Sequence, residues 1–226
     1  MRVFEGRALF SDRPDAGRRL AEKLIRYSNT ASVVLAIPRG GVPVAVEVAG
    51  KLGTSLDIIV PRKITIPYNP EAGYGAVTED GSIVLNQPLV KQLGLTEFQI
   101  QAQAHAVQAE IQRRINVFRT VFPVSRLEGK TAIIIDDGLA SGFTMLAAVK
   151  SARRRKANKI VVAVPVASSN AYDLVKPEAD EIECLIVANS YPFAVASYYR
   201  NWYDLDDEEV LNYLKEWQQR KSLSAA

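Results

Sequence analysis

The chain has one cysteine, one histidine and no long apolar run among its 226 residues. Cys184 cannot form a disulfide within the chain, which fits a reducing compartment. His105 stands alone, so sites built on paired histidines are excluded and a serine-type triad is disfavoured. No stretch reaches the ~20 apolar residues of a membrane span, and residues 1–5 lack the apolar core of a signal peptide. We therefore expect a cytoplasmic protein with no membrane partner.

Common nucleotide-binding motifs are absent as well. The sequence contains neither G-x-x-x-x-G-K-[ST] nor G-x-G-x-x-G, which argues against a nucleoside triphosphatase and a dinucleotide-binding enzyme. The formal charge of +3 is too small to indicate nucleic acid by itself, but it suits an anionic small molecule. The length suffices for one domain, residues 1–226, with an accessory lobe.

Short apolar runs alternate with helical patterns along most of the chain. A run of this kind, without polar alternation, is typical of a strand buried on both faces of a parallel sheet. We expect such strands at residues 33–37, 56–60, 132–135, 160–167 and 183–187. The pattern predicts a parallel α/β sheet with right-handed crossovers and helices on both faces. The loops that begin at Pro38, Pro61 and Asp136 follow strand ends, so we expect them to meet in one crevice.

The strand at 132–135 leads into the most informative segment. Asp136 and Asp137 follow it directly, and small and polar residues then run into a helix at 145–155. The start of a helix offers unpaired N–H groups and a positive dipole end to an anion. Two carboxylates would repel a phosphate unless hydroxyls or a divalent cation lie nearby, so a phosphorylated sugar fits best. The alternative is an ordinary corner whose acids cap the helix.

Residues 132–144 resemble the 5-phosphoribosyl diphosphate (PRPP) motif of the type I phosphoribosyltransferases. The resemblance implies that Asp136 and Asp137 hold the ribose hydroxyls of PRPP. The loop after them would hold its phosphate through Gly138, Leu139, Ala140, Ser141, Gly142, Phe143 and Thr144. Gly138 departs from the aliphatic residue that many members carry there.

Two further loops carry cations after strands. Arg39 precedes Gly40 and Gly41, where glycine allows a close approach of the backbone to a ligand. Arg62 and Lys63 follow the next strand and resemble a pair in adenine and orotate phosphoribosyltransferases. The resemblance implies that all five residues bind the pyrophosphate side of PRPP. Read without it, the first loop is a plain turn and the second an exposed strand end.

The resemblance implies a transfer of ribose 5-phosphate from PRPP to a nitrogenous base. Arg39, Lys63, Asp136 and Asp137 are the expected catalytic residues, with Mg²⁺ held mainly by PRPP rather than by protein ligands. Members acting on 6-oxopurines carry an acid where this chain has Ala140. The sequence therefore disfavours a hypoxanthine or guanine mechanism and is nearer the adenine pattern.

Residues 67–128 form an expected insertion that closes over the sugar phosphate. We predict a loop at 67–75, a hairpin turning at Asp80 and Gly81, and a helix capped by Thr96 that runs to about Arg119. Residues 189–226 are expected to form a C-terminal hood and helix. Phe193 in the hood is a candidate for stacking on the acceptor base, although its aromatic neighbours are equally suited to cover a core.

Two other functions are compatible with this pattern. A non-catalytic regulator could sense PRPP or nucleotides and bind RNA through the basic residues 153–156, although cations are also favoured at a helix C-terminus. A phospho-receiver would need its acids after the first strand, and none follows Ile37. For the enzyme we expect small-molecule partners, namely PRPP and a base, no nucleic acid, and a homodimer.

Overall fold

The computed structural model describes residues 9–66, 69–121 and 123–224. The strands of the central sheet are β1 Ser32–Ala36, β2 Ser55–Ile58, β6 Thr131–Ile135, β7 Lys159–Ser168 and β8 Glu181–Ala188. They pair in the order β2-β1-β6-β7-β8, and all of these pairs are parallel. The prediction of a parallel α/β sheet is confirmed. The expected second strand is shorter than predicted, because the chain leaves the sheet after Ile58 to start a second sheet.

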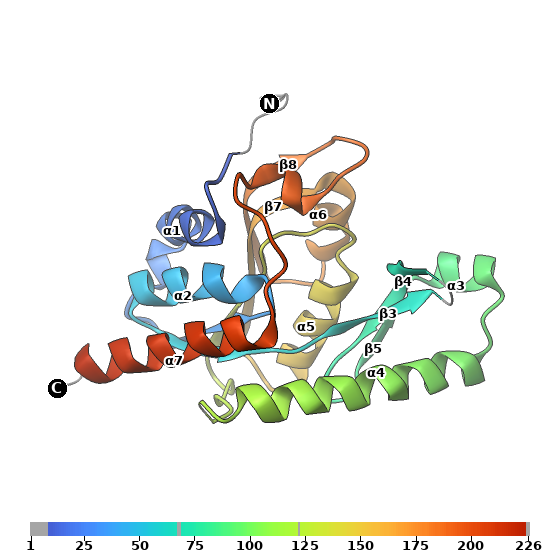
Figure 1. The fold of residues 1–226 in the computed structure, drawn as a ribbon, viewed down its shortest axis with the longest axis horizontal. Coiled ribbons are helices and arrows are strands. Elements are labelled where there is room, and N and C mark those ends of the chain that lie inside the picture. Colours follow the sequence, from blue (N-terminus) through green and yellow to red (C-terminus); the bar gives the residue numbers. More distant parts are fainter. Residues whose placement is uncertain (1–8, 67–68, 122, 225–226) are drawn as a thin grey trace.

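Helices cover both faces of the central sheet (Figure 1). One face carries α1 Arg13–Lys23, α2 Gly41–Leu52 and α7 Asp207–Ser224, and the other carries α5 Phe143–Arg154 and α6 Ser169–Val175. Successive residues of a strand point to opposite faces. Val34 accordingly packs with Leu20 and Val44 on the first face, while Val33 packs with Met145 on the second. This burial on both sides explains the unbroken apolar runs of the sequence.

A second, antiparallel sheet projects from the central one beside a long helix (Figure 1). Its strands are β3 Arg62–Ile66, β4 Asn69–Val77 and β5 Ile83–Leu85, in that order. They are followed by α3 Gln87–Leu93 and α4 Glu97–Phe118, and short 3₁₀ helices lie at Ile25–Tyr27 (η1) and Val195–Tyr198 (η2). The hairpin at Asp80 and Gly81 is confirmed by the pairing of β4 with β5. The capping box of Thr96 is also confirmed, and α4 ends one residue before Arg119.

The predicted loop at 67–75 is wrong from residue 69 onward, where β4 begins; residues 67–68 lie outside the described residues. Its glycines serve close packing between strands rather than a turn. A Cβ on Gly75 would lie 2.5 Å from the carbonyl oxygen of Val84, and a Cβ on Gly73 would lie 2.2 Å from Lys63 Cγ. Glycine is therefore required where neighbouring strands approach closely.

The insertion shares its core with the central sheet. Ile100, Ile111 and Phe118 of α4 are buried in the same apolar cluster as Val34 and Ile133. His105 is exposed on α4, as the helical pattern predicts. None of the helices in the described part of the chain combines the length and the apolar character that crossing a bilayer requires.

Charged side chains hold the base of the insertion to the sheet. Asp57 at the end of β2 is fully buried, and its carboxylate accepts from the backbone N–H groups of Ile58 at 2.7 Å and Ser125 at 2.8 Å. Arg119, just after α4, and Arg155, just after α5, both pair with it. This acid therefore joins three elements that are distant in sequence.

The basic run at 153–156 has an acidic partner at every position. The pairs are Arg153 with Asp180, Arg154 with Asp80, Arg155 with Asp57, and Lys156 with Glu128. Each cation of the run therefore takes part in an ion pair within the protein.

Candidate active site

The loop after β1 lies directly against the loop after β6. The two strands are neighbours, with Ala36 opposite Ile135, and the N–H of Ile37 donates to the Ile135 carbonyl oxygen at 2.9 Å. A Cβ on Gly40 would come within 1.9 Å of Asp137 Oδ2, and a Cβ on Gly41 within 2.6 Å of the Ile135 oxygen. Both positions therefore require glycine. The predicted convergence of these two loops is confirmed, and the third loop follows β2, the other neighbour of β1.

Asp136 and Asp137 form a crowded pair of carboxylates. The N–H of Asp137 donates to Asp136 Oδ1 at 2.8 Å. Burial, and next the charge of Asp137, raise the pKa of Asp136 well above its usual range. Burial also raises the pKa of Asp137, although the guanidinium of Arg13 opposes that shift. Asp136 is thus a half-buried acid whose negative charge is poorly compensated by the protein.

Arg13 is a site residue that the sequence analysis missed. Its Nε lies 2.8 Å from Asp137 Oδ2, its Nη1 donates to the Tyr203 carbonyl oxygen at 2.9 Å, and its guanidinium lies 3.9 Å from the centre of the Trp202 ring. The side chain is almost fully buried. The Tyr199 hydroxyl also donates to the backbone oxygen of Asp137, at 2.7 Å. The start of α1 and the C-terminal aromatic segment therefore both hold this acid.

The PRPP-like loop is packed on both sides before α5 begins. Leu139 extends alongside β7, where its N–H donates to the Val166 oxygen at 2.9 Å. A Cβ on Gly138 would lie 2.7 Å from Val195 Cγ1, which explains why this chain has glycine at that position. Gly142 takes the left-handed conformation, φ 81°, at the N-cap of α5, and Ser141 is exposed. The first turn of α5 follows this loop directly, so its unpaired backbone N–H groups lie at the end of the loop.

Arg62 and Lys63 lie on opposite faces of β3, since they are consecutive in a strand. Arg62 pairs across the strands with Val77, whose side chain belongs to the α4 side of the core, and forms an ion pair with Glu110 of α4. Lys63 pairs with Ala76, whose side chain packs with α5 residues. The two cations therefore reach different sides of the inserted sheet.

The hood residue Phe193 is half-buried, with its ring tilted against Tyr198 at 5.6 Å between centroids. Val195, two residues on, contacts Gly138, so this segment reaches the PRPP-like loop. Ala140 is exposed, and its carbonyl oxygen accepts from Ser168 Oγ at 2.8 Å. The loop offers no third acid at the position where 6-oxopurine enzymes carry one.

Comparison with known proteins identifies the family. The family model described as the phosphoribosyl transferase domain matches residues 77–200, which include both acids and the loop after them. The chain belongs to this family. Its five-stranded parallel sheet with helices on both faces is the type I phosphoribosyltransferase fold.

Relatives with similar sequences extend over most of the chain. A crystal structure of TT1426 from Thermus thermophilus is 38% identical, covers 92% of this chain and 98% of its own, and superposes with a TM-score of 0.77. A Mycobacterium tuberculosis protein, whose name provisionally assigns it to the phosphoribosyl transferases, is 43% identical over 91% of this chain. The match covers 46% of that protein, so this chain spans about half the length of the curated relatives it matches.

A more distant structure shares the fold alone. A Neisseria gonorrhoeae protein solved with bound ppGpp is 16% identical, covers 95% of this chain and 98% of its own, and has a TM-score of 0.50.

Proposed function

We propose that this protein transfers ribose 5-phosphate from PRPP to a nitrogenous base and releases diphosphate. The observation that carries the proposal is the direct contact of the Gly40 backbone with the Asp137 carboxylate. That contact puts a cationic turn suited to the diphosphate beside two acids suited to the ribose hydroxyls. The phosphate loop that starts α5 is contiguous with those acids. One bound molecule of PRPP could therefore engage all three features.

The residues divide the work according to their chemistry. Asp136 and Asp137 accept hydrogen bonds from the ribose hydroxyls and offset the positive charge that develops on the ring as the anomeric bond breaks. Arg39 stabilises the negative charge that gathers on the departing diphosphate, an effect that is typically worth about 3 kcal/mol for each group removed. Lys63 is the second proposed contact of the diphosphate, and it would approach from the side of the inserted sheet opposite to Arg62. The loop from Gly138 to Thr144 binds the 5-phosphate at the start of α5.

Mg²⁺ fits this proposal as a cofactor that arrives with the donor. The described residues include no cluster of three or more histidine, cysteine or acidic side chains that could hold a metal by themselves. The two crowded acids, whose pKa values are raised by burial, are nevertheless suited to a nearby positive charge. Held mainly by PRPP, with Asp136 and Asp137 nearby, Mg²⁺ would supply positive charge that helps to neutralise the leaving group.

The acceptor is a base that does not need an acidic partner from the PRPP-like loop. Ala140 stands where 6-oxopurine enzymes carry that acid, so hypoxanthine and guanine are disfavoured and the adenine-like pattern is nearer. Phe193 is the proposed stacking surface for the base, because its segment reaches Gly138 through Val195. One domain, a homodimeric assembly and a cytoplasmic location complete the proposal, and the homodimer rests on family resemblance.

Diphosphate release from PRPP and Mg²⁺, measured against a panel of bases, tests the proposal when it is combined with a thermal shift by PRPP alone. We expect a shift and turnover with at least one base. Asp136→Asn should lose both, and Asp173→Asn on exposed helix α6 should retain both. A shift without turnover on any base would favour the sensor of PRPP or nucleotides. The absence of any shift would remove both functions.

A further inference from the structure

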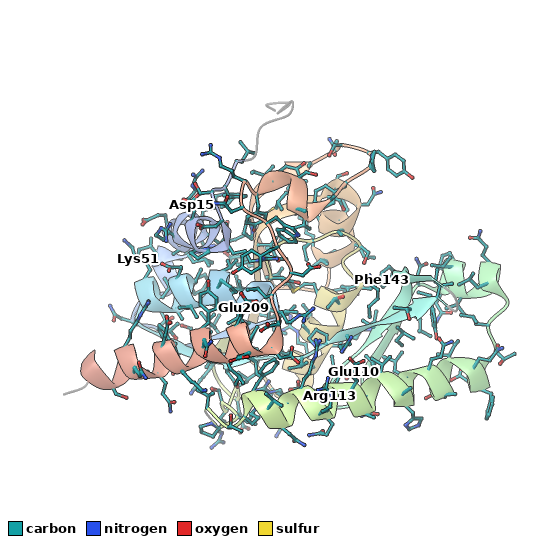
Figure 2. The ribbon with its side chains drawn as sticks, viewed as in Figure 1. Asp15, Lys51, Glu110, Arg113, Phe143 and Glu209 are labelled. Atoms are coloured by element: carbon teal, nitrogen blue, oxygen red, sulfur yellow. The ribbon has the colours of Figure 1, made fainter. Side chains whose placement is uncertain are left out.

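The inserted helix α4 presents two charged residues to the rest of the molecule. Glu110 and Arg114 are four residues apart, so they lie on the same side of the helix. Glu110 forms an ion pair with Arg62 of β3, and Arg114 Nε lies 3.5 Å from Asp207 Oδ2 at the start of α7. Figure 2 shows Glu110 on α4 and Glu209 in the first turn of α7. This side of α4 therefore faces both β3 and α7.

Three guanidinium groups from different elements gather beside this side of α4. Burial lowers the pKa of Arg114, and the positive charges of Arg62 and Arg39 lower it further. Glu110 pairs with Arg62 and Asp207 with Arg114, and Glu208 and Glu209 follow in the first turn of α7. The three guanidinium groups repel one another, and an anion bound among them would relieve that repulsion.

The hydrogen bonds of the cluster are incomplete. Among the described residues, Arg114 Nε and Asp207 Oδ1 are buried and have no hydrogen-bond partner. The Arg114 side chain is only 14% exposed, and at 3.5 Å its contact with Asp207 is longer than a charge-assisted hydrogen bond. An arginine that served only to hold α4 against α7 would be expected to bond closely to this carboxylate. Arg114 thus retains donor capacity inside the cluster.

We propose that Arg114, together with Arg62, extends the anion site of Arg39 and binds the terminal phosphate of a diphosphate group. This inference rests on the proposed function for its choice of PRPP as the physiological ligand. It gives the insertion a direct role: α4 supplies a ligand for the diphosphate rather than only covering the crevice. Guanidinium forks are well matched to phosphate oxygens.

Binding measurements on Arg114→Gln test the proposal, with Arg113→Gln as the matched control. Arg113 is the preceding residue of α4, is exposed, and changes the net charge equally (Figure 2). Titration calorimetry with Mg²⁺ would use inorganic diphosphate, PRPP and ribose 5-phosphate. We expect Arg114→Gln to weaken diphosphate and PRPP binding by about tenfold or more and to leave ribose 5-phosphate unchanged. Unchanged diphosphate binding, or an equal loss for ribose 5-phosphate, would overturn the proposal.

Asp207→Asn separates a ligand role from a purely structural one. If Arg114 binds the diphosphate, removal of its negative neighbour should tighten inorganic diphosphate binding several-fold, because the net charge of the cluster becomes more positive. If Arg114 only holds α4 to α7, the same variant should weaken binding or leave it unchanged. Arg114→Lys, which keeps the charge, should lie between wild type and Arg114→Gln, and it replaces the glutamine variant if that one does not fold.

The outcomes distinguish this inference from the proposed function. Wild-type protein that binds inorganic diphosphate through Arg114 but neither PRPP nor ribose 5-phosphate would support the anion site and remove the transferase. PRPP binding and turnover that are both unchanged in Arg114→Gln would support the transferase and remove the anion site at Arg114. Wild-type protein that binds diphosphate in no form would overturn both.

Discussion

Two clusters of buried charge in this molecule contrast in how they are balanced. Asp57 is fully buried, but two arginines and two backbone N–H groups surround it. Asp136 and Asp137 are half-buried, and Arg13 is the cation that pairs with Asp137 in the described structure. The Asp57 carboxylate is satisfied by the protein itself, although Arg119 Nε and Arg155 Nη1 beside it are buried without a hydrogen-bond partner among the described residues. The second cluster keeps an excess of negative charge.

The difference indicates which cluster serves the fold and which serves a ligand. A buried acid with its partners in place joins elements and has little capacity left for another molecule. An acid whose pKa is raised by burial and by a neighbouring acid is costly to the fold, and such groups occur often at functional sites. The charges of Arg62 and Arg39 likewise lower the pKa of Arg114, so the buried charge there is also incompletely balanced.

The largest effect should come from breaking the balanced cluster. Asp57→Asn leaves two half-buried arginines without their shared carboxylate, and we expect a loss of about 3–5 kcal/mol in the free energy of unfolding. Urea denaturation measures it. Asp173→Asn, the same change on an exposed helix, should stay within about 0.5 kcal/mol of wild type. A loss of less than about 1 kcal/mol for Asp57→Asn would mean that the cluster is not a stabilising one.

Arg13 contributes both to the stability of the fold and to the candidate site. Arg13→Met removes charge-assisted bonds to Asp137 and to the Tyr203 oxygen, so we expect a loss of about 2–3 kcal/mol in unfolding free energy. It should also weaken PRPP binding by about tenfold, since the acids become more negative toward an anionic donor. Arg13→Lys should recover much of the binding. Arg18→Met, on an exposed position of the same helix, is the control.

A purely structural role for Arg13 would give a different pattern. In that case the loss of stability would persist in Arg13→Met while calorimetry showed wild-type affinity for PRPP in the protein that remains folded.

The smallest effect is a change in how stability depends on pH. The pKa of Asp136 is raised in the folded protein, so its contribution to stability is full below the ordinary aspartate pKa and falls as pH rises through the folded value. Asp136→Asn removes this loss. We expect the free energy of unfolding of the variant to increase relative to that of wild type as the pH rises. The difference should be roughly 1 kcal/mol, because two close carboxylates no longer repel each other. Urea denaturation across a pH series measures this difference. A variant whose stability falls relative to wild type as the pH rises would contradict the raised pKa of Asp136.

Local sequence patterns predicted much of the fold and part of the candidate site. Apolar runs marked the strands, Thr96 marked the start of α4, and the acids after β6 marked the crevice. Each of these signals lies within a few neighbouring residues. The meeting of the loops after β1 and β6 was also predicted, because loops at the carboxyl ends of parallel strands share one edge of the sheet. The contact of Gly40 with Asp137 depends on β1 and β6 being neighbours, which the sequence did not predict.

Features that depend on distant contacts were not predictable. Arg13 and Asp137 are 124 positions apart, and nothing near Arg13 distinguishes it from the surface cations of α1. Gly73 and Gly75 resemble turn residues locally, yet their neighbours across the strands require them to be small. Gly138 departs from the family pattern because Val195, far along the chain, fills the space of a side chain.

In the proposed function, the sugar and the diphosphate of PRPP share the space where the Gly40 turn contacts Asp137. Titration calorimetry of PRPP with Mg²⁺ into Gly40→Ala tests it most directly, because the new Cβ would lie 1.9 Å from Asp137 Oδ2 and must separate the two loops. The control is Gly50→Ala on α2, where the nearest atom is 3.6 Å away. We predict that Gly40→Ala remains folded and loses PRPP binding while Gly50→Ala binds as wild type. Wild-type affinity in Gly40→Ala would contradict the account.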